Sequence, residues 1–295
     1  MVVATRLAEN PILWRSEALG MNVNGPSLIE VPDWVPGRLG RYYLYFAHHL
    51  GSHIRLAYAD ALTGPWQVHT PGVLHLEDCP QFRGHIASPD VHVDQDARSI
   101  RLYFHGISGE EADDPTQTTS LATSTDGLTF TNQPALLGES YFRIWQWGGT
   151  YYALSLSGIL WQSPGPGGPF ARGVRLSGLP DTTRHLAVIL RGATLWVAWT
   201  VIGDRPERIF VGAVDLAAGW TKWAVTNVQE LLRPLFDWEG ANAPRAASQP
   251  GEIFEHVNQL RDPAFFSDAS GDYLIYTVAG ESGLAIAEID FERGP

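Results

Sequence analysis

The chain has little of what marks a disulfide-bonded, zinc-bound or membrane-spanning protein. Its 295 residues include one cysteine, Cys79, one lysine, Lys222, and no apolar run near the ~18 residues that a membrane-spanning helix needs. A single cysteine cannot form an intrachain disulfide and has no second thiolate with which to build a zinc site. We therefore expect a fold that is held by packing alone and that does not cross a membrane.

Charge is sparse and mainly negative. Twenty Lys and Arg residues stand against 32 Asp and Glu residues, which gives a net charge of −12, and charged residues make up 18% of the chain against a usual ~25%. Nucleic-acid binding needs basic patches that neutralise phosphates, and scattered arginines in a negative field do not provide them. We predict no nucleic-acid partner, and a neutral or cationic ligand fits this charge better.

Segment 1–14 lacks the continuous apolar stretch of a signal peptide and carries Arg6 and Glu9. Secretion by that route is not indicated, and a solitary cysteine is compatible with a reducing compartment. These two features predict a cytoplasmic location.

Helical periodicity over ten or more residues is also absent. Short runs rich in Tyr, Val, Ile, Leu and Trp alternate with clusters of Gly, Pro, Asp and Ser, and 30 glycines and 20 prolines supply turns. No composition shift or low-complexity tail marks a linker. We predict an all-β chain with one domain over 1–295.

One pattern returns five times along the chain, in which an aromatic strand precedes a second strand and an aromatic residue. The five copies begin with the strands 40–46, 99–104, 149–154, 193–199 and 271–276. Each copy has room for a four-stranded antiparallel sheet, so the repeat predicts a single five-bladed β-propeller. A β-sandwich or a two-domain β protein fits the same alternation and is the alternative. The fifth copy lacks an outer strand, which segment 11–14 is predicted to supply.

The innermost strands of a propeller all start around one end of its axis, so residues at those starts converge although they are far apart in sequence. The predicted starts are 24–29, 87–92, 141–144, 184–188 and 260–266. Loops that return to the same end add further polar side chains. The predicted rim also includes His48, His49, His53, His105, Asp204, Arg205, Glu207, Arg208, Glu239 and Glu281.

The five copies, together with three short motifs, resemble the five-bladed propeller glycoside hydrolases of family 43 and the related families 32, 68 and 117. The motifs are Ser88-Pro89-Asp90-Val91, Arg261-Asp262-Pro263 and Glu239-Gly240. The architecture matches over nearly the whole chain, but each motif is only two to four residues long. The resemblance implies a glycosidase with three carboxylates in a central funnel: an Asp base or nucleophile, a Glu acid, and an Asp that orients the acid.

Carried over by motif, Asp262 matches the Asp of the Asp-Pro motif and Glu239 matches the Glu-Gly acid. Asp90 matches the Pro-Asp position, where it is predicted to stabilise charge on the sugar or to tune the acid. In the proposed reaction, Glu239 protonates the leaving oxygen while Asp262 activates water. An Asp before Pro also starts turns, and Glu239 lies in a Pro- and Ala-rich connection, so both also have a purely structural interpretation.

Two positions depart from the family pattern. Gly25 stands where the resemblance expects the base aspartate of blade one, and segment 141–143 has no acid where an orienting aspartate is expected. Either the carboxylates have moved to other blades or hydrolysis has been lost. The alternatives are a non-catalytic carbohydrate-binding propeller, and a phosphorylase-like relative in which Arg143, His185 and Arg261 hold phosphate.

The first hypothesis is an exo-acting glycoside hydrolase for a small glycoside or oligosaccharide of furanoside, pentose or hexose type. The residues predicted to bind its carbohydrate hydroxyls are Asn24, His48, His49, His85, Arg143, His185, Glu207 and Arg261. The histidine spacing matches no known zinc pattern, so no metal and no cofactor is predicted. Only the family resemblance suggests a calcium ion in the axial channel, and no residue pattern supports one.

Overall fold

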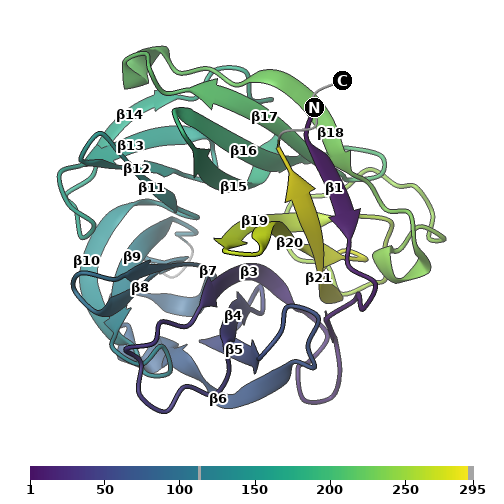
Figure 1. Cartoon of the computed structure of the whole chain (residues 1–295), viewed down its shortest axis with the longest axis horizontal. Helices are drawn as coiled ribbons and strands as arrows, with labels where there is room; N and C mark the ends of the chain where they lie inside the picture. The colour runs from purple at the N-terminus through teal and green to yellow at the C-terminus, as the bar shows by residue number, and fades with distance from the viewer. Residues whose placement is uncertain (112–113, 292–295) are drawn as a thin grey trace.

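The computed structural model describes residues 1–111 and 114–291, and it confirms the predicted five-bladed β-propeller (Figure 1). In these residues, 21 strands form five antiparallel sheets around one axis. Blade one consists, from the axis outward, of β3 (Asn24–Glu30), β4 (Tyr42–Ala47), β5 (His53–Ala59) and β6 (Gln67–His75). Blade two consists of β7 (Arg83–Asp94), β8 (Ser99–Ile107), β9 (Gln117–Ser124) and β10 (Thr131–Glu139).

The third and fourth blades repeat this order. Blade three consists of β11 (Arg143–Trp147), β12 (Thr150–Leu154), β13 (Ile159–Ser163) and β14 (Ala171–Arg175). Blade four consists of β15 (Thr183–Arg191), β16 (Thr194–Val201), β17 (Ile209–Asp215) and β18 (Thr226–Leu232). Three short 3₁₀ helices lie in connections: η1 (Leu76–Asp78), η2 (Trp220–Lys222) and η3 (Asp237–Glu239). In the described part of the chain, none of the helices is long and apolar enough to cross a membrane.

The fifth blade joins the two ends of the chain. It consists of β19 (Arg261–Asp268), β20 (Gly271–Val278), β21 (Gly283–Asp290) and the N-terminal strand β1 (Val3–Arg6). The N-terminal segment therefore closes the ring, but the main outer strand lies earlier than 11–14. The short β2 (Leu13–Trp14) pairs with the beginning of β21, and β1 pairs with its end.

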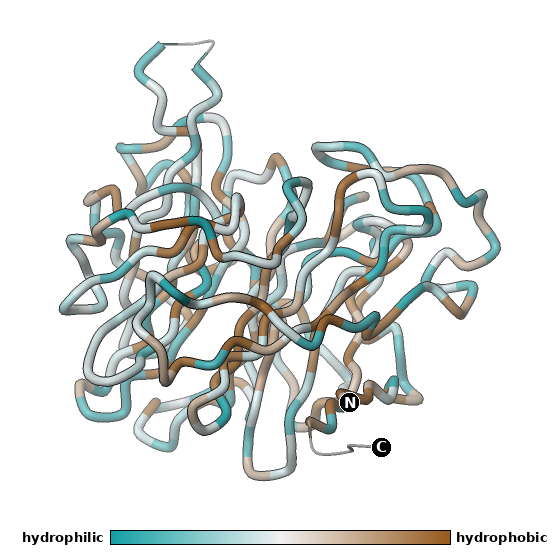
Figure 2. Tube along the Cα trace, turned by 90° about the horizontal axis from the view of Figure 1, so that it is seen from above, coloured by the Kyte–Doolittle hydropathy of each residue, from teal (hydrophilic) through white to brown (hydrophobic). Residues whose placement is uncertain are grey.

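The core lies between blades rather than within them. Alternate residues of β4 point in opposite directions, because side chains of a strand alternate between its two faces. Tyr43 and Tyr45 pack against blade two, whereas Leu44 and Phe46 pack against blade five. Five apolar clusters of this kind fill the spaces between neighbouring sheets. Figure 2 shows the chain turned by 90°, with hydrophilic residues common in the loops beyond the strand ends.

One backbone feature repeats where the innermost strands begin. The residues Gly25, Ser88, Tyr141, His185 and Asp262, one from each blade, have φ values of 57°, 52°, 67°, 51° and 44°. In blades one, two, four and five, the strand register shifts at this point, which marks a β-bulge. A bulge releases a residue from the ladder and turns its side chain in a new direction. Each blade thus presents one position toward the axis.

Proline follows three of these five residues, at Pro26, Pro89 and Pro263. Proline has no N–H for the ladder and is tolerated in sheets at bulges, where pairing is already interrupted. This explains why prolines occur beside the axis of the propeller.

Candidate active site

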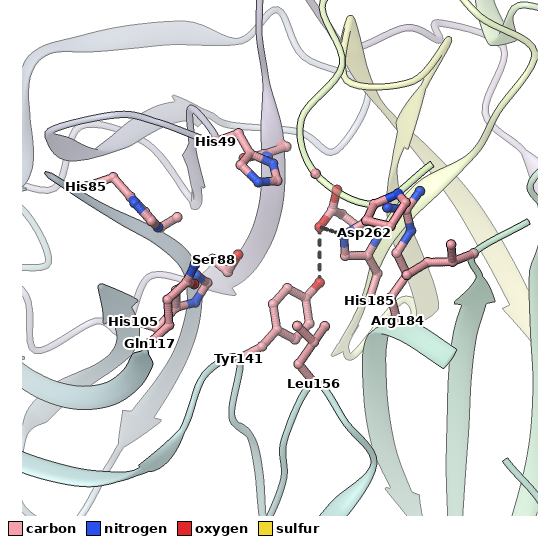
Figure 3. Close-up of a pocket in the computed structure, with 15 residues that line it drawn as sticks. His49, His85, Ser88, His105, Gln117, Tyr141, Leu156, Arg184, His185 and Asp262 are labelled. Carbon is pink, nitrogen blue, oxygen red and sulfur yellow. Dashed lines mark hydrogen bonds and ion pairs between the residues drawn. The ribbon is translucent and has the colours of Figure 1, made fainter. Parts of the chain in front are cut away.

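A pocket of about 260 Å³ lies where these strand starts converge (Figure 3). It is lined by Asn24, His49, His85, Ala87, Ser88, His105, Gln117, Tyr141, Leu156, Arg184, His185, Ile202, Pro250, Gly251 and Asp262. Four of the five positive-φ residues, Ser88, Tyr141, His185 and Asp262, are among them. Pockets for drug-sized ligands enclose ~300–1,000 Å³, so this one suits a ligand about as large as one sugar unit.

Gly25 is the bulge residue that adds no side chain. A Cβ at this position would lie 3.0 Å from the Cα of Ser88, and the positive φ of Gly25 would strain any other residue. The aspartate that the family resemblance expects here is absent from the sequence, and a side chain at this position would require the backbone of Ser88 to shift. At the equivalent position of blade three stands Tyr141, so this blade also contributes no carboxylate here.

Asp262 is the only carboxylate among the described residues that line the pocket. Its side chain is almost fully buried; the Tyr141 hydroxyl donates to Oδ1 at 3.2 Å, and His185 Nε2 lies 3.6 Å from the same oxygen (Figure 3). Burial and the nearby negative charge of Glu281 raise the pKa of Asp262. A carboxyl group with a raised pKa in a pocket is suited to proton transfer near neutral pH.

Three polar atoms around this pocket have no hydrogen-bond partner among the described residues: Asn24 Oδ1, His105 Nδ1 and Asp262 Oδ2. All three residues are more than nine-tenths buried. Buried polar atoms are nearly always satisfied by protein, water or ligand. Water, or a ligand with several hydrogen-bonding groups, can satisfy these atoms in the pocket.

The four imidazoles of the pocket differ in charge. Burial lowers the pKa of His85, and lowers the pKa of His105 and His185 further, so these rings are neutral at pH 7. Burial also acts against the charged form of His49, but its hydrogen bond and charge interaction with Glu281 outweigh it and raise the pKa. His49 is therefore the imidazole that holds a proton most firmly.

Glu281 is fully buried behind His49. Its Oε2 lies 3.4 Å from His49 Nδ1, and Asn22 and Asn24 donate to the same oxygen. Burial acts to raise the pKa of Glu281, but these contacts and the charge of Arg261 outweigh it and hold the pKa below its usual range. Because Nδ1 faces Glu281, the opposite ring nitrogen of His49, Nε2, is the one available to a ligand.

Buried charges alternate from Glu281 to the other side of the pocket. Arg261 Nη1 donates to Glu281 at 2.9 Å, and Arg261 Nε lies 3.2 Å from Glu207 Oε2. Glu207 in turn accepts a hydrogen bond from Arg184 Nε at 2.8 Å. The two carboxylates and two guanidiniums neutralise one another, and His49 and Arg184 at the ends of this network line the pocket.

The structure brings five of the predicted site residues together. Asn24, His49, His85, His185 and Asp262 all line the pocket. Arg261 and Glu207 lie behind it in the charge network and are fully buried, so they support the pocket instead of meeting a sugar.

His48 lies beside the pocket rather than in its lining. Its ring packs near Phe254, with centroids 5.9 Å apart, and its Nδ1 accepts from the backbone N–H of Leu50.

Asp90 and Arg143 do not join the pocket, which corrects their predicted roles. They line a separate cavity of about 380 Å³ that is formed by later residues of the inner strands. Asp90 Oδ2 accepts from the backbone N–H of Ile144 at 2.9 Å and lies 2.8 Å from His92 Nε2. The bulge explains the error: it turns Ser88 into the pocket, and Asp90, two residues later, lies past it.

Arg143 lies beneath Tyr141, with its guanidinium 3.9 Å from the ring centroid. It donates to the carbonyl oxygens of Leu186 and Pro89, so it holds inner strands of neighbouring blades together.

Glu239 is not positioned to act as the acid. It is fully buried in η3 and is absent from the pocket lining. Arg6 Nε donates to its Oε1 at 2.7 Å and the Tyr276 hydroxyl donates at 3.0 Å, while the backbone N–H of Leu235 donates to Oε2 at 2.8 Å. The contacts with Arg6 and Tyr276 join the long 233–260 connection to β1 and β20 of blade five, and the contact with Leu235 fixes the connection itself, which is a structural role.

Substitution of Glu239 tests this assignment. We expect Glu239→Gln to destabilise the protein by about 2–3 kcal/mol, because an amide cannot accept all the hydrogen bonds that this buried carboxylate accepts. The loss should appear as a lower midpoint in urea unfolding. The turnover of the folded fraction should stay near that of the wild type, and a hundredfold loss of turnover without a stability change would restore Glu239 to the mechanism.

Several lining residues did not stand out in the sequence as pocket residues. Ser88 and Tyr141 lie at predicted strand starts but were not assigned to the site, and Gln117, Leu156 and Ile202 have no distinctive chemistry. The sequence signal that could have found Ser88 is its place before a proline at a strand start, which it shares with Asp262. In the described residues, no group of three or more His, Cys, Asp or Glu side chains is arranged to hold a metal ion.

Solved structures with the same architecture are family-43 glycoside hydrolases. A β-xylosidase/α-arabinofuranosidase from a compost microbial metagenome has a TM-score of 0.64 and 12% identity, with 98% of this chain and 94% of that chain covered. A family-43 enzyme from Xanthomonas citri, in complex with xylotriose, has a TM-score of 0.63 and 13% identity, with 90% and 87% covered. An α-L-arabinofuranosidase from Lactobacillus brevis has a TM-score of 0.63 and 10% identity, with 96% and 93% covered.

The protein is thus a five-bladed β-propeller of the type found in family-43 glycoside hydrolases, and at these identities the likeness establishes the fold. No known protein-family model matches the chain. An uncharacterized protein of Acanthamoeba polyphaga mimivirus, R118, is 37% identical over 300 residues, which cover 91% of this chain and 84% of the viral protein. The chain belongs to the family of this mimivirus protein.

Proposed function

We propose that the protein is a glycoside hydrolase that removes one terminal sugar unit from a small glycoside or oligosaccharide. The observation that carries this proposal is the buried carboxylate of Asp262, which lies in a sugar-sized pocket of a glycosidase fold and whose Oδ2 has no partner within 1–111 and 114–291. A pocket with room for about one sugar unit favours cleavage at the end of a substrate. The xylosidase and arabinofuranosidase activities of similar structures favour a pentose.

In this proposal Asp262 is the general base. Its ionised form accepts a proton from a water molecule as the water oxygen attacks the anomeric carbon. Tyr141 donates to Oδ1, which orients the carboxylate and leaves Oδ2 for the water.

His49 is the proposed general acid. Its Nε2 donates a proton to the glycosidic oxygen as the bond from that oxygen to the anomeric carbon breaks, so the leaving group departs as a neutral alcohol. Glu281 is the positioning residue, because its carboxylate fixes the ring through Nδ1 and keeps it protonated. The neutral rings of His85, His105 and His185 and the amide of Asn24 bind sugar hydroxyls.

A second candidate is a propeller that binds a saccharide without cleaving it. The specific observation in its favour is that one carboxylate lines the pocket, whereas the family resemblance implies three. The phosphorylase-like alternative has no such support. Arg143 is engaged by carbonyl oxygens beneath Tyr141 and Arg261 by two glutamates, so they do not converge with His185 on one anion.

A panel of 4-nitrophenyl pentosides and hexosides, in furanose and pyranose forms, tests the proposal. We expect release of nitrophenol from at least one glycoside. If none is cleaved but a monosaccharide binds in calorimetry, the protein is a binding propeller. If none is cleaved and none binds, the carbohydrate proposal is wrong.

The pH profile tests the assignment of His49 and Glu281. Activity rises with pH as Asp262 loses its proton and falls at higher pH as His49 loses its proton, so kcat/KM should follow a narrow bell. Because both pKa values are raised, the acidic limb should lie above the ordinary ~3.9 of aspartate and the basic limb above the ordinary ~6.5 of histidine.

Glu281→Gln removes the charge that raises both pKa values, so both limbs should move to lower pH by about 1 unit. Two other charged groups, Asp262 and Glu252, also act on His49, and both remain in this variant. If Glu281→Gln loses activity while both limbs of the kcat/KM profile stay at their wild-type pH, Glu281 only maintains the fold.

A further inference from the structure

A groove opens from the pocket between blades two, three and four. It encloses about 500 Å³ and shares four lining residues with the pocket: Gln117, Leu156, Arg184 and Ile202. A ligand that fills the pocket can therefore extend directly into the groove. The pocket alone is too small for two sugar units, so any second unit needs a place of this kind.

The groove offers both apolar and hydrogen-bonding surface. Leu156 and Ile202 provide apolar contacts, whereas Ser140, Ser157 and Thr183 provide hydroxyl groups. Thr183 is 7% exposed, and its Oγ1 has no hydrogen-bond partner among the described residues. A sugar ring presents C–H groups on its faces and hydroxyls on its edge, so it matches this mixture.

Charge limits which sugar the groove accepts. Its lining contains two carboxylates, Glu139 and Asp181, and one guanidinium, Arg184, which is already paired with Glu207. Glu139 is paired with Arg172, but Asp181 is fully exposed with its nearest guanidinium, Arg175, at 3.5 Å. The chain as a whole also carries a net charge of −12. An acidic group entering the groove meets repulsion and finds no unpaired cation in its lining.

We propose that this groove is the leaving-group site and that it binds a sugar unit without an acidic group. The substrate is then a saccharide of at least two units, with its terminal unit in the pocket and its next unit, neutral or amino-bearing, between blades two and four. This inference rests on the proposed function, since it takes the pocket as the site of the terminal sugar.

Calorimetric titration of the Asp262→Asn variant tests the groove without hydrolysis. The probes are xylose, xylobiose, and a xylosyl disaccharide whose reducing unit is glucuronic acid. We expect xylobiose to bind at least tenfold more tightly than xylose, and the acidic disaccharide to bind at least tenfold more weakly than xylobiose.

Two blocking variants in the same background, Ser157→Trp and Asp181→Trp, place an indole in the groove from blade three and from blade four, at residues that line the groove and not the pocket. Each should abolish the advantage of xylobiose and change xylose binding less than twofold. Phe254→Trp is the matched control, because Phe254 lies on the rim near His48, away from the groove, and it should alter neither affinity. Thermal unfolding of each variant verifies that it is folded.

The outcomes separate the two proposals. Failure of both xylose and xylobiose to bind would count against the pocket as a pentose site, and the groove inference would fall with it. If xylose binds and xylobiose binds no more tightly, or if the tighter binding of xylobiose survives both blocking variants, the groove inference is wrong and the pocket proposal stands. A gain abolished by Phe254→Trp would place the second sugar on the other rim, and equal binding of the acidic disaccharide overturns the charge argument.

Discussion

Asp262→Asn should lower kcat/KM by at least a hundredfold while the protein remains folded. Asp262 is the carboxylate that can accept a proton from water in this pocket, and general-base catalysis contributes about 10²–10⁴-fold to rate. The amide of asparagine keeps the size of the side chain, and its oxygen can still accept the Tyr141 hydroxyl. Binding of a monosaccharide should therefore change much less than turnover.

The measurement is steady-state kinetics on the best nitrophenyl glycoside, with circular dichroism to verify the fold. Asp90→Asn is the matched control, since Asp90 lies in the separate cavity on the inner strands. It should keep turnover near the wild-type value. Activity of Asp262→Asn within a fewfold of the wild type would remove Asp262 from the mechanism and leave saccharide binding as the better explanation of the pocket.

The fold could be predicted because its signal is repeated and local. The aromatic strand of the first copy, 42–46, has large residues on both of its faces, and this pattern fits a sheet that is buried on both sides. Five copies then imply five such sheets around an axis. The N-terminal strand was harder to place, because β1 and β2 both pair with β21 and nothing in the sequence ranks 3–6 above 11–14.

The site could be predicted only where the repeat itself placed a residue. Asn24, His185 and Asp262 stand at strand starts, and their positions follow from the propeller. Glu239 and Asp90 were assigned from dipeptide motifs, which do not specify where a side chain points. Arg6, 233 residues away in the chain, forms a buried ion pair with Glu239, and no local sequence pattern predicts such a contact.

The sequence also contains no sign of the positive φ at the five strand starts. Ser88, Tyr141, His185 and Asp262 adopt positive φ without glycine, which costs of order 1–3 kcal/mol each and persists only where packing requires it. Propensity rules read such residues as ordinary strand. This strain recurs in four of the five blades around one pocket, which supports the proposal that a ligand binds there.

The buried charge network should make Arg261 the most important side chain for stability around the site. Arg261 is 1% exposed and lies between Glu207 and Glu281, which are both fully buried. Arg261→Met has a similar length but removes the shared cation. Glu207 retains Arg184, whereas Glu281 is left with His49 and two amides. Breaking a buried ion pair from one side costs about 3–5 kcal/mol, because the partner charge stays buried without compensation.

Urea unfolding of Arg261→Met should show this loss, while Arg245→Met, at an exposed arginine, should stay within about 0.5 kcal/mol of the wild type. The double variant Arg261→Met/Glu281→Gln separates charge from packing. If the cost arises from an unpaired carboxylate, the second substitution should recover part of the loss, and the two effects should not add. Additive losses would mean that Arg261 acts through packing alone, and the alternating charges would then have no part in holding His49 and Asp262 in place.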